Sequence, residues 1–174
     1  MDRNNLILYI NTIKYLKFDQ VFYRIKNLFK IRPFRFSIKG THLEKNLIIW
    51  NNYLLNSKSY LGNNKFKFLN LEVGFKNKIN WNYKENGKLW LYNLNYFDYL
   101  NSDHNYENKY QFIKLINRWI ENNNFLSIEN DPYPTSLRII NWIKWSLQNN
   151  YYEKKFLESL YIQLLYLNEN IEYD

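Results

Sequence analysis

The sequence contains no cysteine and no alanine, and only two histidines, four glycines and three prolines among its 174 residues. Without cysteine there is no disulfide, no thiolate nucleophile and no thiolate metal ligand. The two histidines, His42 and His104, stand far apart in the sequence, which argues against a zinc site. A glycine-rich phosphate loop and a serine elbow are also missing. The sequence therefore predicts no metal and no cofactor.

Long apolar runs are absent as well. No run approaches the ~20 residues that a membrane helix requires. The first stretch, MDRNNLILYINTIKYLKF, is too polar and too interrupted for the core of a signal peptide, and no small-residue cleavage site follows it. On these grounds we expect a soluble, cytoplasmic protein with no membrane partner.

The composition, 46% hydrophobic and 23% charged, is typical of a globular chain. The net charge of +8 suggests an acidic partner. A second explanation stays open, because Asn, Lys, Ile, Tyr and Phe have A/T-rich codons and mutational drift alone would enrich them. The aromatic residues fall on helix stripes and the lysines fall off them. We therefore expect no nucleic-acid partner, since a strand-binding surface interleaves the two kinds of residue.

The first half of the chain mixes helical and extended patterns. Helices are predicted at Asp19–Phe29 and from Thr41 to about Leu55, where Thr-His-Leu-Glu has the spacing of a capping box. The stretch NSKSYLGNN is typical of a loop. Apolar and polar residues then alternate over Phe66–Phe68 and Leu71–Phe75, which predicts two short strands. Asn86-Gly87 indicates a turn.

The second half shows the 3.6-residue periodicity of amphipathic helices. Helices are predicted at Lys88–Leu100, Asn105–Asn122, Thr135–Asn149 and Tyr152 to about Glu172. An alternation of helices with short loops is typical of antiparallel helical hairpins. The predicted fold is mainly α, with a short extended or β segment around residues 65–80, in a single domain spanning residues 1–174.

Two of the three prolines stand in the stretch DPYPTSLR, directly before a tryptophan-rich helix. A residue before proline is pushed out of the α region, so Asp131 and Tyr133 are predicted to be extended. Thr135 or Ser136 could then cap the helix through its hydroxyl. Such an entry would be rigid, and its free amides and helix dipole would favour an anion.

Arg138 would lie in the first turn of that helix, where a positive charge is locally disfavoured. It therefore needs an anionic partner, either a carboxylate of this chain or a ligand. Trp142 and Trp145 are predicted to be core together with Ile139 and Ile143.

Two carboxylates, Asp98 and Asp103, could pair as acid and base. A position at a helix end or in a turn is the simpler explanation for both, and His104 in its polar loop is expected to be solvated.

The stretch PYPTSLRIINWIKW resembles a segment of the heparinase II/III family of bacterial polysaccharide lyases. Four further stretches resemble segments of that family in the same order: TIKYLKFDQVFYRI, FKFLNLEVGF with INWN, KLWLYNLNYFDYL, and SLYIQLLYLNENIEY. In two places this chain differs from the family. Asn95 stands where histidine is usual, and Asn130 where tryptophan is common.

The resemblance implies an incomplete α/α toroid of helical hairpins, followed in the family by a β-sandwich. It also implies β-elimination at a uronic acid, in which a base removes the proton beside the carboxylate and an acid protonates the leaving oxygen. The family's neutralising Asn and its catalytic Tyr and His correspond to segments beyond Asp174. No catalytic role passes to a residue of this chain, which is expected to be inactive alone. A non-catalytic carbohydrate-binding or scaffold remnant is the alternative.

In such a toroid the inner helices begin at the rim that faces the substrate. The chain would then form one wall of a groove for an acidic polysaccharide. The predicted substrate-binding residues are Tyr133, Thr135, Ser136, Arg138, Asn95 and Tyr96. The last helix would lack part of its covering layer, which predicts self-association through an apolar patch. The apolar residues expected in that patch are Leu160, Leu164, Leu165 and Ile171.

Overall fold

The computed structural model describes residues 56–102, 109–122 and 130–170, and in addition Lys14, Tyr15, Lys17, Phe18 and Phe22. The chain divides into two compact units, Met1–Ser37 with Ile171–Asp174, and Ile38–Asn170. All the helices and strands below belong to the second unit. Apart from Phe22, which is helical, the predicted helices at Asp19–Phe29 and after Thr41 lie outside the described residues.

A three-stranded antiparallel sheet, in the order β1-β2-β3, opens the described part of the chain. Its strands are β1 (Tyr60–Gly62), β2 (Lys65–Phe68) and β3 (Leu71–Gly74). The two predicted strands are confirmed as β2 and β3. The prediction of a loop over residues 56–64 was wrong for β1. Asn63 and Asn64 both adopt positive φ, which asparagine tolerates, so a tight hairpin forms and the Tyr60 ring packs 5.1 Å from Phe66.

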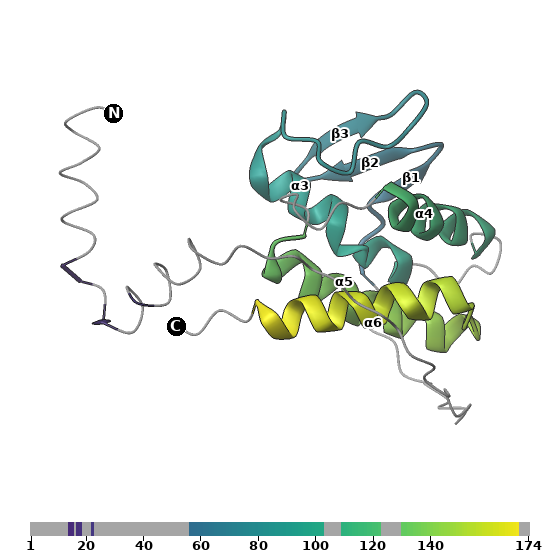
Figure 1. The fold of residues 1–174 in the computed structure, drawn as a ribbon. Coiled ribbons are helices and arrows are strands. Elements are labelled where there is room, and N and C mark those ends of the chain that lie inside the picture. The colour runs from purple at the N-terminus through teal and green to yellow at the C-terminus, as the bar shows by residue number, and fades with distance from the viewer. Residues whose placement is uncertain are drawn as a thin grey trace. The chain divides into compact units, whose positions relative to one another are not determined.

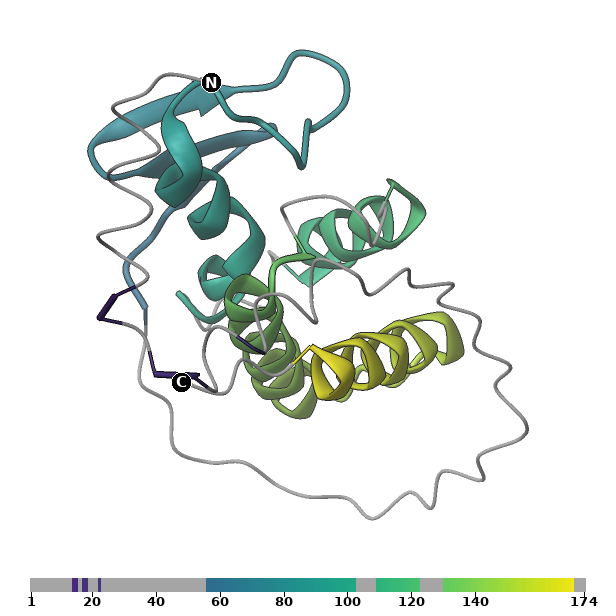
Figure 2. The ribbon, with the colours of Figure 1, turned by 60° about the vertical axis from the view of Figure 1, so that its left-hand side comes forward.

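The fold is mainly helical, as predicted. The helices are α3 (Gly87–Tyr96), the 3-10 helix η1 (Asp98–Asn101), α4 (Lys109–Asn122), α5 (Pro132–Asn149) and α6 (Lys154–Glu169). Figures 1 and 2 show α3 between the sheet on one side and the α5–α6 pair on the other. A short connection joins α5 to α6, which confirms one predicted helical hairpin. The toroid itself stays a prediction.

Phe97 ends α3 within the stretch predicted as one continuous helix. It adopts the left-handed conformation, with φ of 56°. That conformation costs about 1–2 kcal/mol for an L-residue. The ring is fully buried, however, and stacks on Trp81 at 5.4 Å and meets Trp142 edge-on at 5.4 Å. Burial of a phenylalanine ring contributes about 1.5–3 kcal/mol, so the tertiary contacts offset the local strain.

The start of α5 differs from the predicted entry. Asp131 is extended, with φ of −51° and ψ of 149°, as expected for a residue before proline. The helix begins at Pro132, however, so the predicted extended Tyr133 and the cap by Thr135 or Ser136 were wrong. Both prolines are tolerated because the first-turn amides have no partner inside the helix. In the first turn of the helix, the Thr135 amide donates a hydrogen bond to the Asp131 carbonyl at 3.1 Å.

One continuous core of aromatic and aliphatic side chains joins the sheet to the helices. The sheet contributes Phe66 and Phe68, and Phe68 lies 5.2 Å from Trp90 of α3. Trp142 and Trp145 are buried, which confirms their predicted place in the core. Ile143 is 39% exposed, so its prediction as core was wrong.

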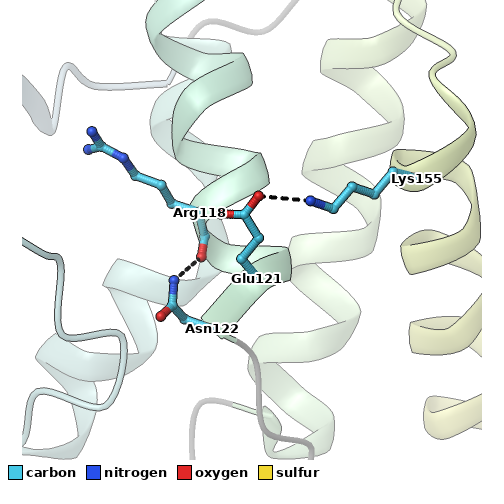
Figure 3. A network of polar contacts seen from close by, with 4 residues as sticks. All are labelled: Arg118, Glu121, Asn122 and Lys155. Carbon is cyan, nitrogen blue, oxygen red and sulfur yellow. Dashed lines mark hydrogen bonds and ion pairs between the residues drawn. The ribbon is translucent and has the colours of Figure 1, made fainter.

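Polar contacts join α4 to α6 and to the β1–β2 turn. Lys155 of α6 donates to the carboxylate of Glu121 at 2.8 Å (Figure 3). On the same helix the Asn122 side chain donates to the Arg118 carbonyl. The Arg118 side chain points away from the ion pair (Figure 3). Its guanidinium donates to the side-chain oxygen of Asn64, in the β1–β2 turn, at 3.0 Å. The Glu121–Lys155 pair is exposed and contributes little to stability.

The α5–α6 hairpin carries several exposed apolar side chains. Besides Tyr133, four large ones are exposed: Ile140, Ile143, Tyr161 and Leu164. Leu164 is 45% exposed, as predicted for the last helix, and Leu165 is half-buried. Leu160 was also expected to be uncovered, but it is buried because it packs into the core. Ile171 lies outside the described residues, and self-association stays a prediction. Among the described helices, none has the length and apolar character to cross a membrane.

Candidate functional site

Three tyrosines gather where α3 meets the start of α5. Lys88, Tyr92 and Tyr96 are spaced four residues apart, which places them along one side of α3. Asp131 and Tyr133, at the beginning of α5, lie against that side. These five residues are called the tyrosine surface below. It brings together side chains more than 30 residues apart in the sequence.

The rings of the tyrosine surface form a triangle. The centroid of Tyr133 lies 6.2 Å from that of Tyr92 and 5.8 Å from that of Tyr96, and the Tyr92 and Tyr96 centroids are 6.4 Å apart. The Tyr96 and Tyr133 planes are nearly perpendicular, at 86°. Edge-to-face contact of this kind is favourable, because the positive ring edge meets a negative ring face. Each ring therefore holds the next one in place.

Asp131 is the polar centre of the surface. Its carboxylate accepts a hydrogen bond from the Tyr92 hydroxyl at 2.5 Å and pairs with the Lys88 ammonium at 3.1 Å. The ammonium also lies 5.1 Å above the Tyr92 ring. Hydrogen bonds to Tyr92 and Asp131 raise the pKa of Lys88, which keeps it cationic. Burial, together with the bond to Asp131, raises the pKa of Tyr92 and keeps its hydroxyl protonated as a donor.

The three rings differ in exposure. Tyr133 is 59% exposed, Tyr92 is half-buried, and Tyr96 is only 9% exposed. Burial raises the pKa of Tyr96 well above its ordinary value, so this hydroxyl stays neutral. The surface thus presents one aromatic face, a nearby ammonium, and carboxylate and hydroxyl groups that are already paired. It can bind by stacking and by attracting an anion.

Arg138 lies at the centre of a buried polar cluster, called the arginine network below. The guanidinium is fully buried and donates to the Gln163 side chain at 2.6 Å, the Asn130 side chain at 3.0 Å, the Thr135 hydroxyl at 3.1 Å and the Asn95 carbonyl at 3.3 Å. Its central carbon lies 4.0 Å above the ring of Trp119. These contacts connect Arg138 to α3, α4 and α6 at once.

Asn95 has a full set of hydrogen bonds within the same network. Its side-chain amide donates to the carbonyls of Trp81 and Leu91, both at 2.9 Å. Its side-chain oxygen accepts from the Trp119 indole at 3.0 Å, and its backbone carbonyl accepts from Arg138. A buried amide satisfied in this way fixes the position of α3.

The structure divides the predicted binding residues into two groups. Tyr133 is exposed, Ser136 is half-buried with its hydroxyl donating to the Tyr133 carbonyl at 2.8 Å, and Tyr96 supports the Tyr133 ring. Asn95, Thr135 and Arg138 are fully buried in the arginine network. The described contacts of Arg138 are neutral oxygens and the Trp119 ring, and the carboxylate or ligand expected beside it stays a prediction.

The other predicted candidates add little to this site. Asp98 is the first residue of η1, which confirms its expected place at a helix end. Burial raises the pKa of its carboxyl group. Asp103 and His104 lie outside the described residues. Within the described ranges, no group of three His, Cys, Asp or Glu side chains could hold a metal ion.

Sequence reasoning missed three residues of the tyrosine surface, namely Lys88, Tyr92 and Asp131. A signal for the first two was present, because Lys88, Tyr92 and Tyr96 follow at intervals of four in a predicted helix. No pattern in the sequence indicated that Asp131 would meet them.

Comparison with known proteins finds no matching family model, no matching curated protein and no matching solved structure. The resemblance to the heparinase II/III family, which rests on the quoted stretches, stays a prediction.

Proposed function

We propose that this chain binds a uronate-containing acidic polysaccharide through the tyrosine surface, as the N-terminal helical part of a heparinase II/III-like lyase. The resemblance supplies the family and the reaction class. The exposed Tyr133 ring, held at the start of α5, is the observation on which the binding site rests.

Tyr133 is suited to stacking on a sugar. The C–H face of a pyranose ring is apolar and weakly positive, and the face of an aromatic ring is negative. The ring lies in the first turn of a helix and against Tyr96, so little conformational entropy remains to be lost on binding. A ring that is more than half exposed yet held in this way is ready to receive a ligand.

Lys88 gives the surface its preference for an acidic sugar. Its side chain is more than half exposed although it pairs with Asp131, so a uronate carboxylate can approach it from solvent. The paired carboxylate of Asp131 orients the ammonium and the Tyr92 hydroxyl. Sugar hydroxyls can then donate to Asp131 while the sugar carboxylate meets Lys88.

The arginine network has a supporting role in this proposal. It connects α3, which contributes Tyr92 and Tyr96, to α5, which contributes Tyr133. Arg138, Thr135 and Asn95 would thereby fix the spacing of the rings without touching the polymer. The family's carboxylate-neutralising amide, base and acid have no counterpart among these residues, so the proposed part of this chain in the reaction is to hold the polymer.

Replacement of Tyr133 tests the proposal. An aromatic side chain that stacks on a nucleobase contributes about 1–3 kcal/mol. With a contribution at the lower end of that range for a sugar, Tyr133→Ala is expected to weaken binding of short uronate oligosaccharides from alginate, pectate and heparan by about fivefold or more. Isothermal titration calorimetry measures this. Tyr133→Phe keeps the ring and should bind nearly as the native chain does.

Tyr110 provides a matched control, because it is 76% exposed and its neighbour Lys109 contacts Asn149, at the opposite end of α5 from Tyr133. Tyr110→Ala should leave the affinity unchanged. The proposal fails if the native chain binds none of the three glycans, or if the Tyr133 and Tyr110 variants lose affinity equally.

A further inference from the structure

Five exposed lysines lie along the chain between β2 and the start of α3. They are called the lysine strip below: Lys65, Lys67, Lys76, Lys78 and Lys84. None of them belongs to the tyrosine surface or to the arginine network.

The sheet places the first two lysines on one face. Successive side chains of a strand point to opposite faces, so Lys65 and Lys67 project away from the core into which Phe66 and Phe68 pack. Opposite them in β3 stand Gly74 and Glu72. Glu72 approaches Lys65 only at 3.8 Å, and both side chains are more than half exposed, so this pair offsets little of the charge.

The remaining lysines continue from the sheet to α3. The connection between β3 and α3 is held on the core by Tyr83, whose ring lies 5.6 Å from Phe75 and 5.2 Å from Trp90. The Gly87 amide donates to the Lys84 carbonyl at 3.0 Å, just before α3 begins. Lys88, the first residue of the tyrosine surface, follows in the first turn of α3. The lysines therefore follow one another along the chain from the sheet to the first turn of α3, where the tyrosine surface begins.

The charge is unevenly distributed over the described residues. Residues 56–102 have seven lysines against three carboxylates, whereas residues 130–170 have four cationic side chains and four carboxylates. Drift toward A/T-rich codons would raise lysine content in both segments alike. Residues 109–122 have three cationic side chains against one carboxylate, so within the described residues the excess lies on the sheet, the β3–α3 connection and α4.

We propose that the lysine strip is a second contact region for the acidic polysaccharide, so that the chain holds an extended stretch of polymer from the sheet face to Tyr133. This inference rests on the proposed function and adds to it that the ligand is a long polyanion. Exposed ammonium groups on flexible stems suit carboxylates or sulfates that recur at intervals along a polymer. Each group neutralised also releases a counterion, which favours longer ligands.

The test compares two double variants with the same change in net charge. Lys65→Gln with Lys67→Gln removes two charges from the strip, and Lys144→Gln with Lys154→Gln removes two exposed charges from α5 and α6. Binding is measured against uronate oligomers of increasing length and against the polymer, over a range of salt concentrations.

The strip variant is expected to bind the polymer about tenfold more weakly at low salt, and its slope of log affinity against log salt should fall by about 1.5. Its affinity for the shortest oligomer should be unchanged, because Tyr133 is intact. The Lys144/Lys154 variant should bind the polymer nearly as the native chain does.

Equal losses in both double variants would mean a general charge effect and would overturn the inference. Native polymer affinity in the strip variant would also overturn it, while leaving the Tyr133 result to decide the proposed function. Binding of duplex DNA by the native chain as tightly as of the polymer, and its loss in the strip variant, would replace the glycan by a nucleic acid at this strip.

Discussion

Removal of the Arg138 side chain is expected to destabilise the fold strongly. The guanidinium is fully buried, and it donates to one residue of α3, one of α6, the Thr135 hydroxyl and the Asn130 side chain. Arg138→Met keeps an unbranched side chain of similar length but removes every donor. The change therefore isolates the polar contribution from that of packing.

The magnitude follows from the groups left behind. Four oxygen acceptors would lose a charged donor, and a buried polar group left unsatisfied costs about 1–3 kcal/mol. The contact with the face of Trp119 contributes up to about 2 kcal/mol where it is desolvated. Removal of the buried charge recovers part of this, because its desolvation penalty disappears. The expected net loss is about 3–5 kcal/mol, a large part of the 5–15 kcal/mol typical of a domain.

Urea unfolding, followed by tryptophan fluorescence and by circular dichroism, measures the loss. Arg118→Met is the matched control, since Arg118 is exposed and its side chain donates to Asn64 alone among the described residues. Its free energy of unfolding should change by less than about 0.5 kcal/mol. Arg138→Lys keeps the charge but not the planar fork of donors, and it should fall between the native chain and Arg138→Met.

The reasoning is refuted if Arg138→Met unfolds within about 1 kcal/mol of the native chain. That result would mean that water or rearranged side chains satisfy the acceptors, and that the network does not hold the helices together. A second refutation is a lysine variant as stable as the native chain, because a single ammonium cannot reproduce the geometry of the fork.

Two further predictions concern other parts of the fold. Burial raises the pKa of Asp98, so its carboxyl group holds a proton more tightly in the folded state than in the unfolded chain. Above the pKa of the unfolded carboxyl group, the charged form of Asp98 therefore lowers the stability of the fold. Asp98→Asn should therefore stabilise the protein at pH 7, and this gain should vanish in urea titrations below about pH 3.9; a destabilised variant at pH 7 would contradict the assignment. The exposed Ile140 and Leu164 should promote self-association, so that Ile140→Gln with Leu164→Gln lowers the mean mass in sedimentation equilibrium, and a monodisperse native monomer would count against it.

Much of the local structure was determined by the sequence itself. The stripes of apolar residues predicted α4, α5 and α6 to within a few residues, because a helix that packs on a core must repeat its apolar side chains every 3.6 residues. Alternation predicted β2 and β3 for the corresponding reason. The burial of Trp142 and Trp145 also followed from their spacing.

The local predictions that failed did so where tertiary contacts outweigh backbone preference. Phe97 takes a left-handed conformation because its ring gains more from the core than the backbone loses. Tyr133 joins α5 although the following proline disfavours the helical conformation sterically, and its ring packs against Tyr92 and Tyr96 of α3.

Which side chains meet at the candidate site was decided by the tertiary structure. The sequence predicted that the segment around Arg138 belongs to the site. It did not determine whether the guanidinium faces a ligand or the interior, because its partners come from α3, from α6 and from Asn130. In the same way, Asp131 meets Lys88 and Tyr92 only because α3 packs on α5. Contacts between distant segments depend on how helices pack, and the periodicity of one helix fixes which of its sides is apolar but not which neighbour covers that side.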